Sequence, residues 1–296
     1  MRRWLVIAVP YVWLLVFFLI PFLIVFKISL SDVATAIPPY VPIFDLSAGW
    51  EAFKESWNAL DFENYSFIAS DELYTSAYWS SVKIAAVATF LMLLIAYPLA
   101  YGMARAPKEW QPTLMMLVIL PFWTSFLIRV YAWIGILKNE GLLNMLLMNL
   151  GIISEPLDIM NTTTAVYIGI VYSYLPFMVL PLYASLEKID GRLLEAAEDL
   201  GSPPWKAFWQ VTFPLSIPGI VAGCFLVFIP AVGEFVIPDL LGGSDTLMIG
   251  KTLWNEFFNN RDWPVSSAVA VVLLLVLIVP IVAFQWVQQR QREALR

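Results

Sequence analysis

The 296-residue chain is 60% hydrophobic and only 14% charged, with a mean hydropathy of +0.76 and a net charge of −6. Soluble domains are about half apolar and about one quarter charged. The chain has no histidine and a single cysteine, Cys224, which excludes histidine-based acid–base chemistry, histidine metal ligands and disulfides within the chain. This composition indicates a protein whose surroundings are largely lipid.

Several apolar segments are long enough to cross a bilayer, which takes about 20 helical residues. They are 5–29, 79–104, 113–137, 164–186, 213–238 and 265–287. The first resembles a secretory signal followed by a cleavage site at 34–36, but its apolar run is too long and Lys27 interrupts it. We therefore expect an uncleaved first span, 1–30, and an all-α integral membrane fold with six transmembrane helices.

The charged residues predict the orientation of these spans. With the N-terminus inside, ten of the seventeen Lys and Arg residues fall in cytoplasmic loops and tails. Residues 31–78 carry eight acidic side chains, Asp45 among them, and a single basic one, Lys54. This asymmetry follows the positive-inside rule. It predicts cytoplasmic termini, a periplasmic acidic loop at 31–78, five further helices within 79–287 and a cytoplasmic tail at 288–296, in a bacterial inner membrane.

The loop between the fourth and fifth segments, 187–212, has the pattern of two short helices with a sharp bend. Asp190 is placed to cap the first helix, Gly201 to end it in a left-handed conformation, and Ser202 with Pro203 to start the second. The apolar stripe of the first helix is Leu193, Leu194, Ala197 and Leu200. Periodicity alone fits a helix on the membrane surface equally well.

The residues of this loop resemble a specific motif. The run is Glu195-Ala196-Ala197, three residues, Gly201, nine residues, Val211, one residue, Phe213-Pro214. It resembles the "EAA" motif of ATP-binding-cassette (ABC) importer permeases, with Val and Phe at positions where that family has Ile and Leu. The resemblance implies a type I ABC permease fold in which this loop forms a coupling helix that docks on an ATPase subunit. The implied coupling residues are Glu195, Ala196, Ala197, Gly201 and Pro214.

No catalytic motif accompanies this loop. Gly250-Lys251-Thr252 ends like a phosphate-binding loop, but six residues separate Gly250 from the preceding glycine, Gly243, where the motif has four. The sequence offers no paired carboxylates, serine triad or metal-ligand cluster. We expect a transport subunit that is not an enzyme and binds no cofactor or metal, with ATP and Mg²⁺ held by a partner chain.

The resemblance extends over almost the whole chain. Four stretches look like the permeases of bacterial putrescine/spermidine importers: 121–133, 166–183, 230–250 and 257–264. This likeness is closest to the putrescine type. It implies a polyamine as the cargo and three protein partners besides membrane lipid: a second homologous permease, a cytoplasmic ATPase dimer and a periplasmic polyamine-binding protein. Nothing in the sequence indicates a nucleic-acid partner.

Glu234, near the outer end of the fifth segment, is the main candidate for the substrate pathway. Ionisable side chains inside a membrane are costly and usually functional. Our first alternative is a structural ion pair with Arg129 in the third segment. Aromatic and acidic neighbours suited to a polyamine, whose ammonium groups favour carboxylates and aromatic faces, are Tyr172, Tyr174, Trp123, Phe235 and Asp239. Gly219 and Gly223 predict close helix packing.

Three other functions remain open at this point. The same machine could import another small solute, such as an amino acid, an anion or an iron chelate. An autonomous ion-coupled carrier or channel would work without ATP, and the matched coupling motif argues against it. A membrane scaffold without transport activity would leave the bent cytoplasmic loop unexplained.

Overall fold

The computed structural model describes residues 2–44 and 49–294, so Asp45 and the last two residues of the predicted tail lie outside the described residues. The chain forms two compact units. One combines Met1–Tyr78 with Ile249–Arg296, and the other is Trp79–Met248. Helix α5 (Glu72–Arg105) begins in the first unit and continues into the second.

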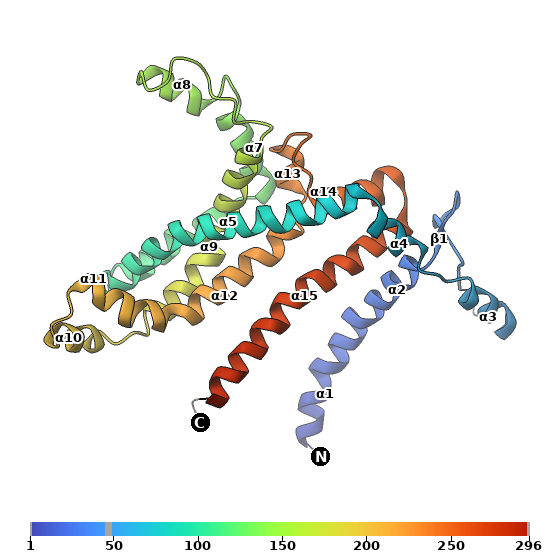
Figure 1. Cartoon of the computed structure of the whole chain (residues 1–296), viewed down its shortest axis with the longest axis horizontal. Coiled ribbons are helices and arrows are strands. Elements are labelled where there is room, and N and C mark those ends of the chain that lie inside the picture. The colour runs from blue at the N-terminus through green and yellow to red at the C-terminus, as the bar shows by residue number, and fades with distance from the viewer. Residues whose placement is uncertain (1, 45–48, 295–296) are drawn as a thin grey trace. The chain divides into compact units, whose positions relative to one another are not determined.

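The first unit is built on two long apolar helical runs. α1 (Arg2–Leu14), the π-helical turn η1 (Leu15–Leu19) and α2 (Ile20–Ser29) follow one another without a gap. α15 (Trp263–Ala294) packs beside α2, as Figure 1 shows. The exposed apolar side chains along α1 and η1 include Trp13 at 63% exposure, which suits contact with lipid rather than with water.

The segment between α2 and α5 contains regular secondary structure, whereas the sequence predicts only an acidic loop there. β1 (Asp32–Val33) and β2 (Tyr40–Val41) form a small antiparallel ladder, and α3 (Trp50–Asn58) and α4 (Glu63–Ser70) follow. The Asn64 side chain donates to the Ser29 carbonyl at 3.1 Å and thereby holds α4 to the end of α2. The two-residue strands carry no alternating pattern long enough to be predicted.

Two tyrosines of α5 connect this helix to the rest of the first unit. The Tyr74 hydroxyl donates to Glu256 Oε1 at 3.0 Å, and the Tyr78 hydroxyl donates to the Val269 carbonyl at 2.7 Å. Glu256 belongs to the π-helical segment η5 (Asn255–Asn260), which follows α14 (Ile249–Trp254). α5 therefore starts seven residues earlier than the predicted span 79–104 and uses its first two turns to fasten η5 and α15.

α9 (Thr163–Leu186) and α12 (Phe213–Val232) form the centre of the second unit, where they lie side by side (Figure 1). Gly219 permits this approach, because a Cβ there would lie 2.5 Å from the Ser185 Cβ and 2.8 Å from the Pro181 carbonyl oxygen. Fully buried side chains of this unit include Met92, Ile170, Met178, Leu182 and Val227.

The third predicted span, 113–137, is not one continuous helix. α6 (Gln111–Ile119) runs into the 3₁₀ turn η3 (Leu120–Trp123), and the chain then bends by 88° before continuing as α7 (Phe126–Leu137) and α8 (Leu142–Asn149). Thr124 has an extended backbone, with ψ at 151°. Pro121 lacks a backbone donor, and the Thr124 hydroxyl donates to its carbonyl at 2.8 Å, which holds the bend.

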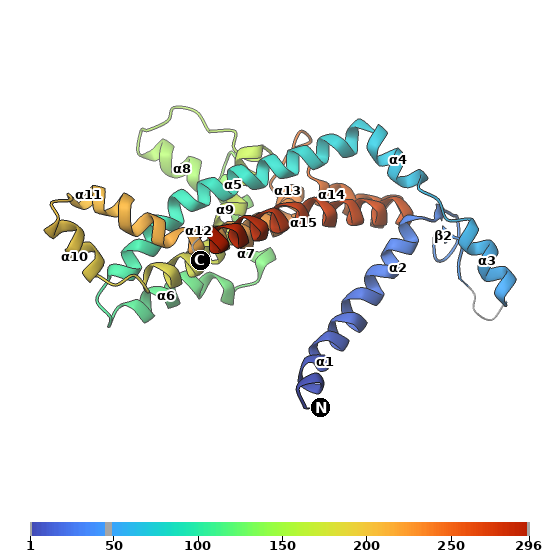
Figure 2. The same ribbon diagram turned by 60° about the horizontal axis from the view of Figure 1, so that its bottom comes forward.

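The fifth predicted span, 213–238, also ends early, because α12 stops at Val232 and Gly233 follows as its C-cap. A short helix, α13 (Val236–Leu240), begins after the break. Glu234 therefore lies in the break and not within a helix. At the other end, α10 (Arg192–Asp199), α11 (Pro204–Ala207) and the π-helical turn η4 (Phe208–Thr212) lead into α12 (Figures 1 and 2).

The predicted membrane fold is confirmed. Within the described residues, five helices are long and apolar enough to cross a membrane, and the bent pair formed by α6 to α8 brings the number to six if it counts as one span.

Candidate functional site

The loop 187–212 starts its first helix as the sequence predicts. Asp190 Oδ1 accepts a hydrogen bond from the Arg192 backbone N–H at 3.0 Å. The first N–H groups of a helix have no partner within the helix, and this carboxylate satisfies one of them. It also places a negative charge at the N-terminal end of α10, where the helix dipole favours it.

The end of α10 is a Schellman motif. The Gly201 N–H bonds to the Glu198 carbonyl at 2.8 Å. The Ser202 N–H bonds to the Ala197 carbonyl at 3.0 Å. Gly201 has φ +82°, the left-handed conformation that this motif requires. The prediction that Ser202 caps the next helix is wrong, because its backbone is used in this motif and α11 begins with Pro203 in the cap position.

The predicted apolar stripe of α10 divides between two environments. Leu194 and Ala197 are half-buried, and α10 as a whole contacts α11 and η4. Leu193 is 47% exposed and Leu200 is 88% exposed. The other predicted coupling residues, Glu195, Ala196, Gly201 and Pro214, are exposed as well. The exposed surface of this bend therefore combines small residues, two leucines and the Glu195 carboxylate. Another protein could bind to such a surface.

Glu234 borders a cavity of about 390 Å³ in the second unit. Its Oε1 accepts from the backbone N–H groups of Val236 at 3.0 Å and Ile237 at 3.3 Å, which satisfies the start of α13. Its Oε2 accepts from the Tyr174 hydroxyl of α9. The side chain is only 7% exposed. The cavity is lined by Phe122, Phe126, Arg129, Ser173, Tyr174, Phe177, Pro230, Gly233, Glu234, Phe235 and Val236.

Arg129 lines the same cavity but does not pair with Glu234. Among the described residues, no salt bridge within 4.0 Å joins these two side chains, whereas Lys108 and Glu187 form one at 3.2 Å. The Arg129 guanidinium instead lies over two aromatic rings, 5.3 Å from the Phe122 centroid and 5.8 Å from the Phe126 centroid. Our first alternative for Glu234, an ion pair with Arg129, is therefore not the arrangement that the structure shows.

The remaining predicted pathway residues divide in two. Phe235 lines the Glu234 cavity, together with Tyr174. Tyr172 lies edge-on to Trp133, with ring centroids 5.3 Å apart, and lines a separate cavity among α5, α6 and α9. Trp123 is 71% exposed, and Asp239 is exposed on α13. The structure therefore brings Glu234, Tyr174 and Phe235 together and leaves the other three outside that cavity.

Besides Arg129, four polar or aromatic residues of this cavity were not predicted as pathway residues. They are Phe122, Phe126, Ser173 and Phe177. Ser173 and Phe177 are separated from each other by one helical turn, so the position of Tyr174 on α9 was a usable signal for their face. The two residues from the bend and α7 had no such signal, because their place depends on the unpredicted break after Trp123.

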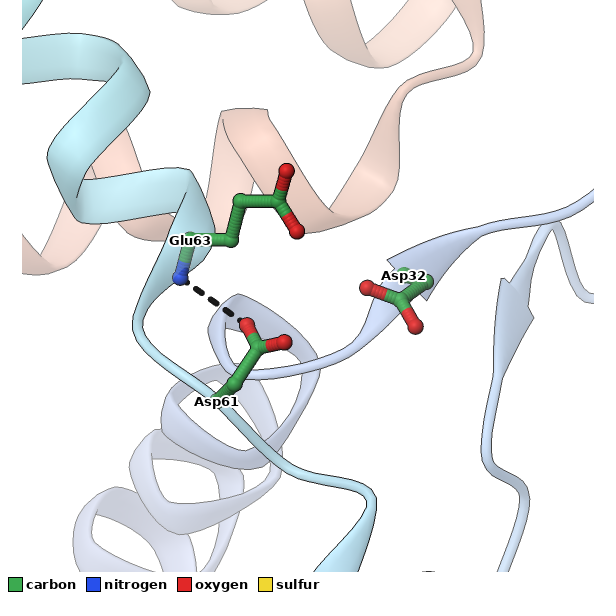
Figure 3. Close-up of side chains that lie close together, drawn as sticks. All are labelled: Asp32, Asp61 and Glu63. Atoms are coloured by element: carbon green, nitrogen blue, oxygen red, sulfur yellow. Dashed lines mark hydrogen bonds between the residues drawn. The ribbon is translucent and has the colours of Figure 1, made fainter.

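An acidic cluster occurs in the first unit, in the segment that the sequence predicts to be acidic. The carboxylates of Asp32, Asp61 and Glu63 lie within 4.8 Å of one another, and all three side chains are exposed (Figure 3). Asp61 Oδ1 also accepts from the Glu63 N–H at 2.9 Å. Exposed acidic groups commonly gather without a bound ion, so this cluster concentrates negative charge and does not define a metal centre.

Apolar spans, an exposed bent loop and a largely apolar cavity that holds two buried charged groups define a polytopic membrane protein of transport type. Residues 4–293 match the family of binding-protein-dependent transport system inner membrane components, and the chain belongs to this family. It is therefore a multi-pass inner-membrane subunit of an ABC importer, and it transports without being an enzyme. An importer of this kind also contains an ATPase and a solute-binding protein.

Relatives and a solved structure agree with this membership. The chain is 41% identical over 271 residues to the spermidine/putrescine transport system permease protein PotB of Haemophilus influenzae, covering 92% of this chain and 88% of that protein. It is 45% identical over 215 residues to PotB of Escherichia coli K12, covering 73% of this chain and 78% of that protein. A bacterial alginate ABC transporter in complex with its periplasmic protein shares the fold, with a TM-score of 0.68 at 15% identity over 94% of this chain and 91% of that one.

Proposed function

We propose that this chain is the permease subunit of an importer for putrescine and spermidine and forms half of the translocation pathway. The observation that carries the substrate class is the 41% identity, over 92% of the chain, to a permease that bears these polyamines in its name. The chemistry of the Glu234 cavity is compatible, because a buried carboxylate and several aromatic faces suit a flexible multiply charged cation.

The loop 187–212 is the proposed coupling element. Glu195, Ala196, Ala197, Gly201 and Pro214 would contact the ATPase. The Schellman end of α10 fixes the bend at Gly201 with backbone hydrogen bonds, so α10 can act as a rigid lever. The continuous helical run Pro204–Val232 joins this lever to the break at Glu234. Movement of α10 can therefore reach the far end of the same helix as a rigid-body shift.

The proposed topology has both termini in the cytoplasm. Loop 31–78 is then periplasmic, and 288–296 is a cytoplasmic tail. The ion pair between Lys108 and Glu187 supports this arrangement, because it brings together two loops that the charge pattern assigns to the same side. The proposed partners are a second homologous permease, a cytoplasmic ATPase dimer that holds ATP and Mg²⁺, and a periplasmic polyamine-binding protein, with lipid around the spans.

Reconstitution of the complete importer in proteoliposomes tests this function. The chain is combined with the second permease, the ATPase and the binding protein, and uptake of radiolabelled putrescine and spermidine is followed with and without ATP. We expect ATP-dependent uptake that disappears when Glu195→Lys replaces the wild-type chain. Uptake by the chain alone without ATP would favour a carrier. ATP-driven import of an amino acid, anion or iron chelate, with no polyamine import, would favour the other solute class.

A further inference from the structure

Two buried groups in the Glu234 cavity lack hydrogen-bond partners among the described residues. They are the Nε and Nη1 atoms of Arg129 and the Oγ atom of Ser173. Arg129 is 8% exposed and Ser173 is 3% exposed. A guanidinium stays charged and can only donate hydrogen bonds. The Phe122 and Phe126 rings attract its charge but leave the Nε and Nη1 donors without an acceptor, and buried donors without acceptors are unfavourable. Both residues line the cavity, so an acceptor for them would lie in it.

Glu234 is not placed to supply this acceptor. A carboxylate offers about four lone-pair positions. Three of those on Glu234 are used by the Tyr174 hydroxyl and the N–H groups of Val236 and Ile237. These bonds hold the carboxylate between α9 and the start of α13, and no salt bridge joins it to Arg129 in the part of the chain that the structure describes.

The chemistry of a suitable acceptor follows from these unpartnered atoms. Arg129 presents N–H donors and a positive charge, and a carboxylate is the group whose two oxygens match a guanidinium. A polyamine cannot fill this place, because its ammonium groups are also positive and donate hydrogen bonds. An unpaired Arg129 would repel such a cargo in a cavity with little water, where charges are poorly screened.

We propose that Arg129 and Ser173 receive a carboxylate side chain from the second permease subunit. This inference rests on the proposed function, in which the two permeases enclose the pathway together. The incoming carboxylate would neutralise Arg129 and leave the cavity with one net negative charge, from Glu234. The pocket would then attract an ammonium group, and assembly of the two permeases would complete the site.

Cysteine cross-linking in the assembled importer locates the partner residue. Cys224→Ser removes the one native cysteine of this chain. Arg129→Cys is then paired with each Asp or Glu of the second permease, replaced in turn by cysteine, and disulfide formation is measured with a mild oxidant. Tyr131→Cys is the matched control, since Tyr131 is 58% exposed and about 200° around α7 from Arg129.

We expect one acidic position to cross-link at least tenfold faster with Arg129→Cys than with Tyr131→Cys. We also expect Arg129→Glu to abolish uptake and a basic residue at that acidic position to restore it. Equal cross-linking of both cysteines at every position, in a complex that still assembles, would overturn the proposal. The cross-link does not depend on cargo, so an importer that moved no polyamine would refute the proposed function and leave this result standing.

Uptake assays distinguish a carboxylate of the second permease from two other acceptors for Arg129, which are water and a carboxylate on the transported solute. Arg129→Met is compared with the wild type for putrescine and for ornithine, a diamine that carries a carboxylate. We expect Arg129→Met to impair assembly and putrescine uptake together. Full stability and uptake in this variant would mean that water satisfies Arg129. Ornithine uptake by the wild type that Arg129→Met loses, with putrescine uptake retained, would place the acceptor on the solute. Either result would overturn the proposal.

Discussion

The Tyr174 hydroxyl donates a hydrogen bond to Oε2 of Glu234, and this contact joins the middle of α9 to the break that follows α12. The same carboxylate satisfies two N–H groups at the start of α13. A single side chain therefore holds three segments together beside the cavity, so its position is fixed by the fold whether or not it also contacts substrate.

Replacement of Tyr174 by phenylalanine should weaken this junction. The variant removes a hydrogen bond to a buried carboxylate, a loss of about 1.5–3 kcal/mol. We expect a lower thermal unfolding temperature of the assembled importer in detergent and reduced polyamine uptake. Tyr131→Phe, on the exposed face of α7, is the control and should leave both unchanged. An unfolding temperature equal to that of the wild type would show that the hydroxyl contributes nothing to stability.

Glu234→Gln tests the charge separately from the shape. The amide oxygen can still accept from the backbone of Val236, so the start of α13 keeps a partner. The negative charge that would favour a cation is lost. We expect polyamine uptake to fall by more than the amount of assembled complex falls, when initial rates are divided by the level of complex. Unchanged uptake kinetics would remove Glu234 from the pathway.

Gly201→Asp should abolish uptake while leaving membrane insertion intact. Gly201 has φ +82°, so any other residue there adds backbone strain of about 1 kcal/mol, and the new charge would lie on the proposed ATPase contact. Glu195→Lys should have the same effect through charge reversal. Gly151→Asp is a matched control, because Gly151 also has a positive φ, +67°, and lies outside the loop. Normal uptake in the Gly201 or Glu195 variant, at wild-type membrane levels, would argue against coupling through this loop.

The sequence predicts the membrane spans well because lipid requires long apolar helices, and a run such as 164–186 can satisfy its backbone hydrogen bonds in lipid only as a helix. It does not predict where a span breaks. Thr124 and Gly233 interrupt segments whose composition is as apolar as that of unbroken helices. Proline is common in all of these segments, and only tertiary contacts decide whether it bends the helix or ends it.

The bend of loop 187–212 could be predicted from the sequence because motif spacing and turn chemistry are local, as the left-handed conformation of Gly201 shows. The cavity could not be assembled in this way. Its walls come from the bend after Trp123, from α9 and from the break at Glu234, three segments far apart in the chain. Charge complementarity suggested that Glu234 pairs with Arg129. In the structure the Glu234 carboxylate accepts hydrogen bonds from backbone N–H groups and from a tyrosine instead of pairing with Arg129. No sequence pattern predicts which of these partners it takes.

The start of α15 offers a test of pH dependence. Asp262 Oδ1 accepts from the Val265 N–H at 2.9 Å and caps this helix. Partial burial raises the pKa of the Asp262 carboxyl above its usual value, the Val265 hydrogen bond opposes this, and the nearby Glu256 adds to it. A folded-state pKa above the unfolded one favours folding at low pH, and this stabilisation is lost as the pH rises through the folded-state pKa.

Asp262→Asn should therefore be more stable than the wild type at neutral pH, because the amide still caps α15 without a partly buried charge. The difference should shrink as the pH falls and vanish below the unfolded-state pKa, about 3.9. Asp262→Ala, which also loses the cap, should be less stable than the asparagine variant by about 1 kcal/mol. Thermal unfolding of the purified chain gives the comparison between about pH 3.5, just below that value, and about pH 7, some three units above it. A difference that grows as the pH falls would contradict the assignment.

Gly219→Ala should separate α9 from α12. The added Cβ would lie 2.5 Å from the Ser185 Cβ and 2.8 Å from the Pro181 carbonyl oxygen, and the backbone oxygen cannot move without shifting α9. Overpacking of this kind costs about 1–3 kcal/mol. At Gly223 the nearest atom is the flexible Met178 sulfur, at 2.6 Å, so the same change should cost less. Gly102→Ala, on a helix with open space at that position, is the control. Unfolding temperatures should fall most for Gly219 and least for Gly102, and equal values for all three variants would show that the close approach of α9 and α12 does not limit stability.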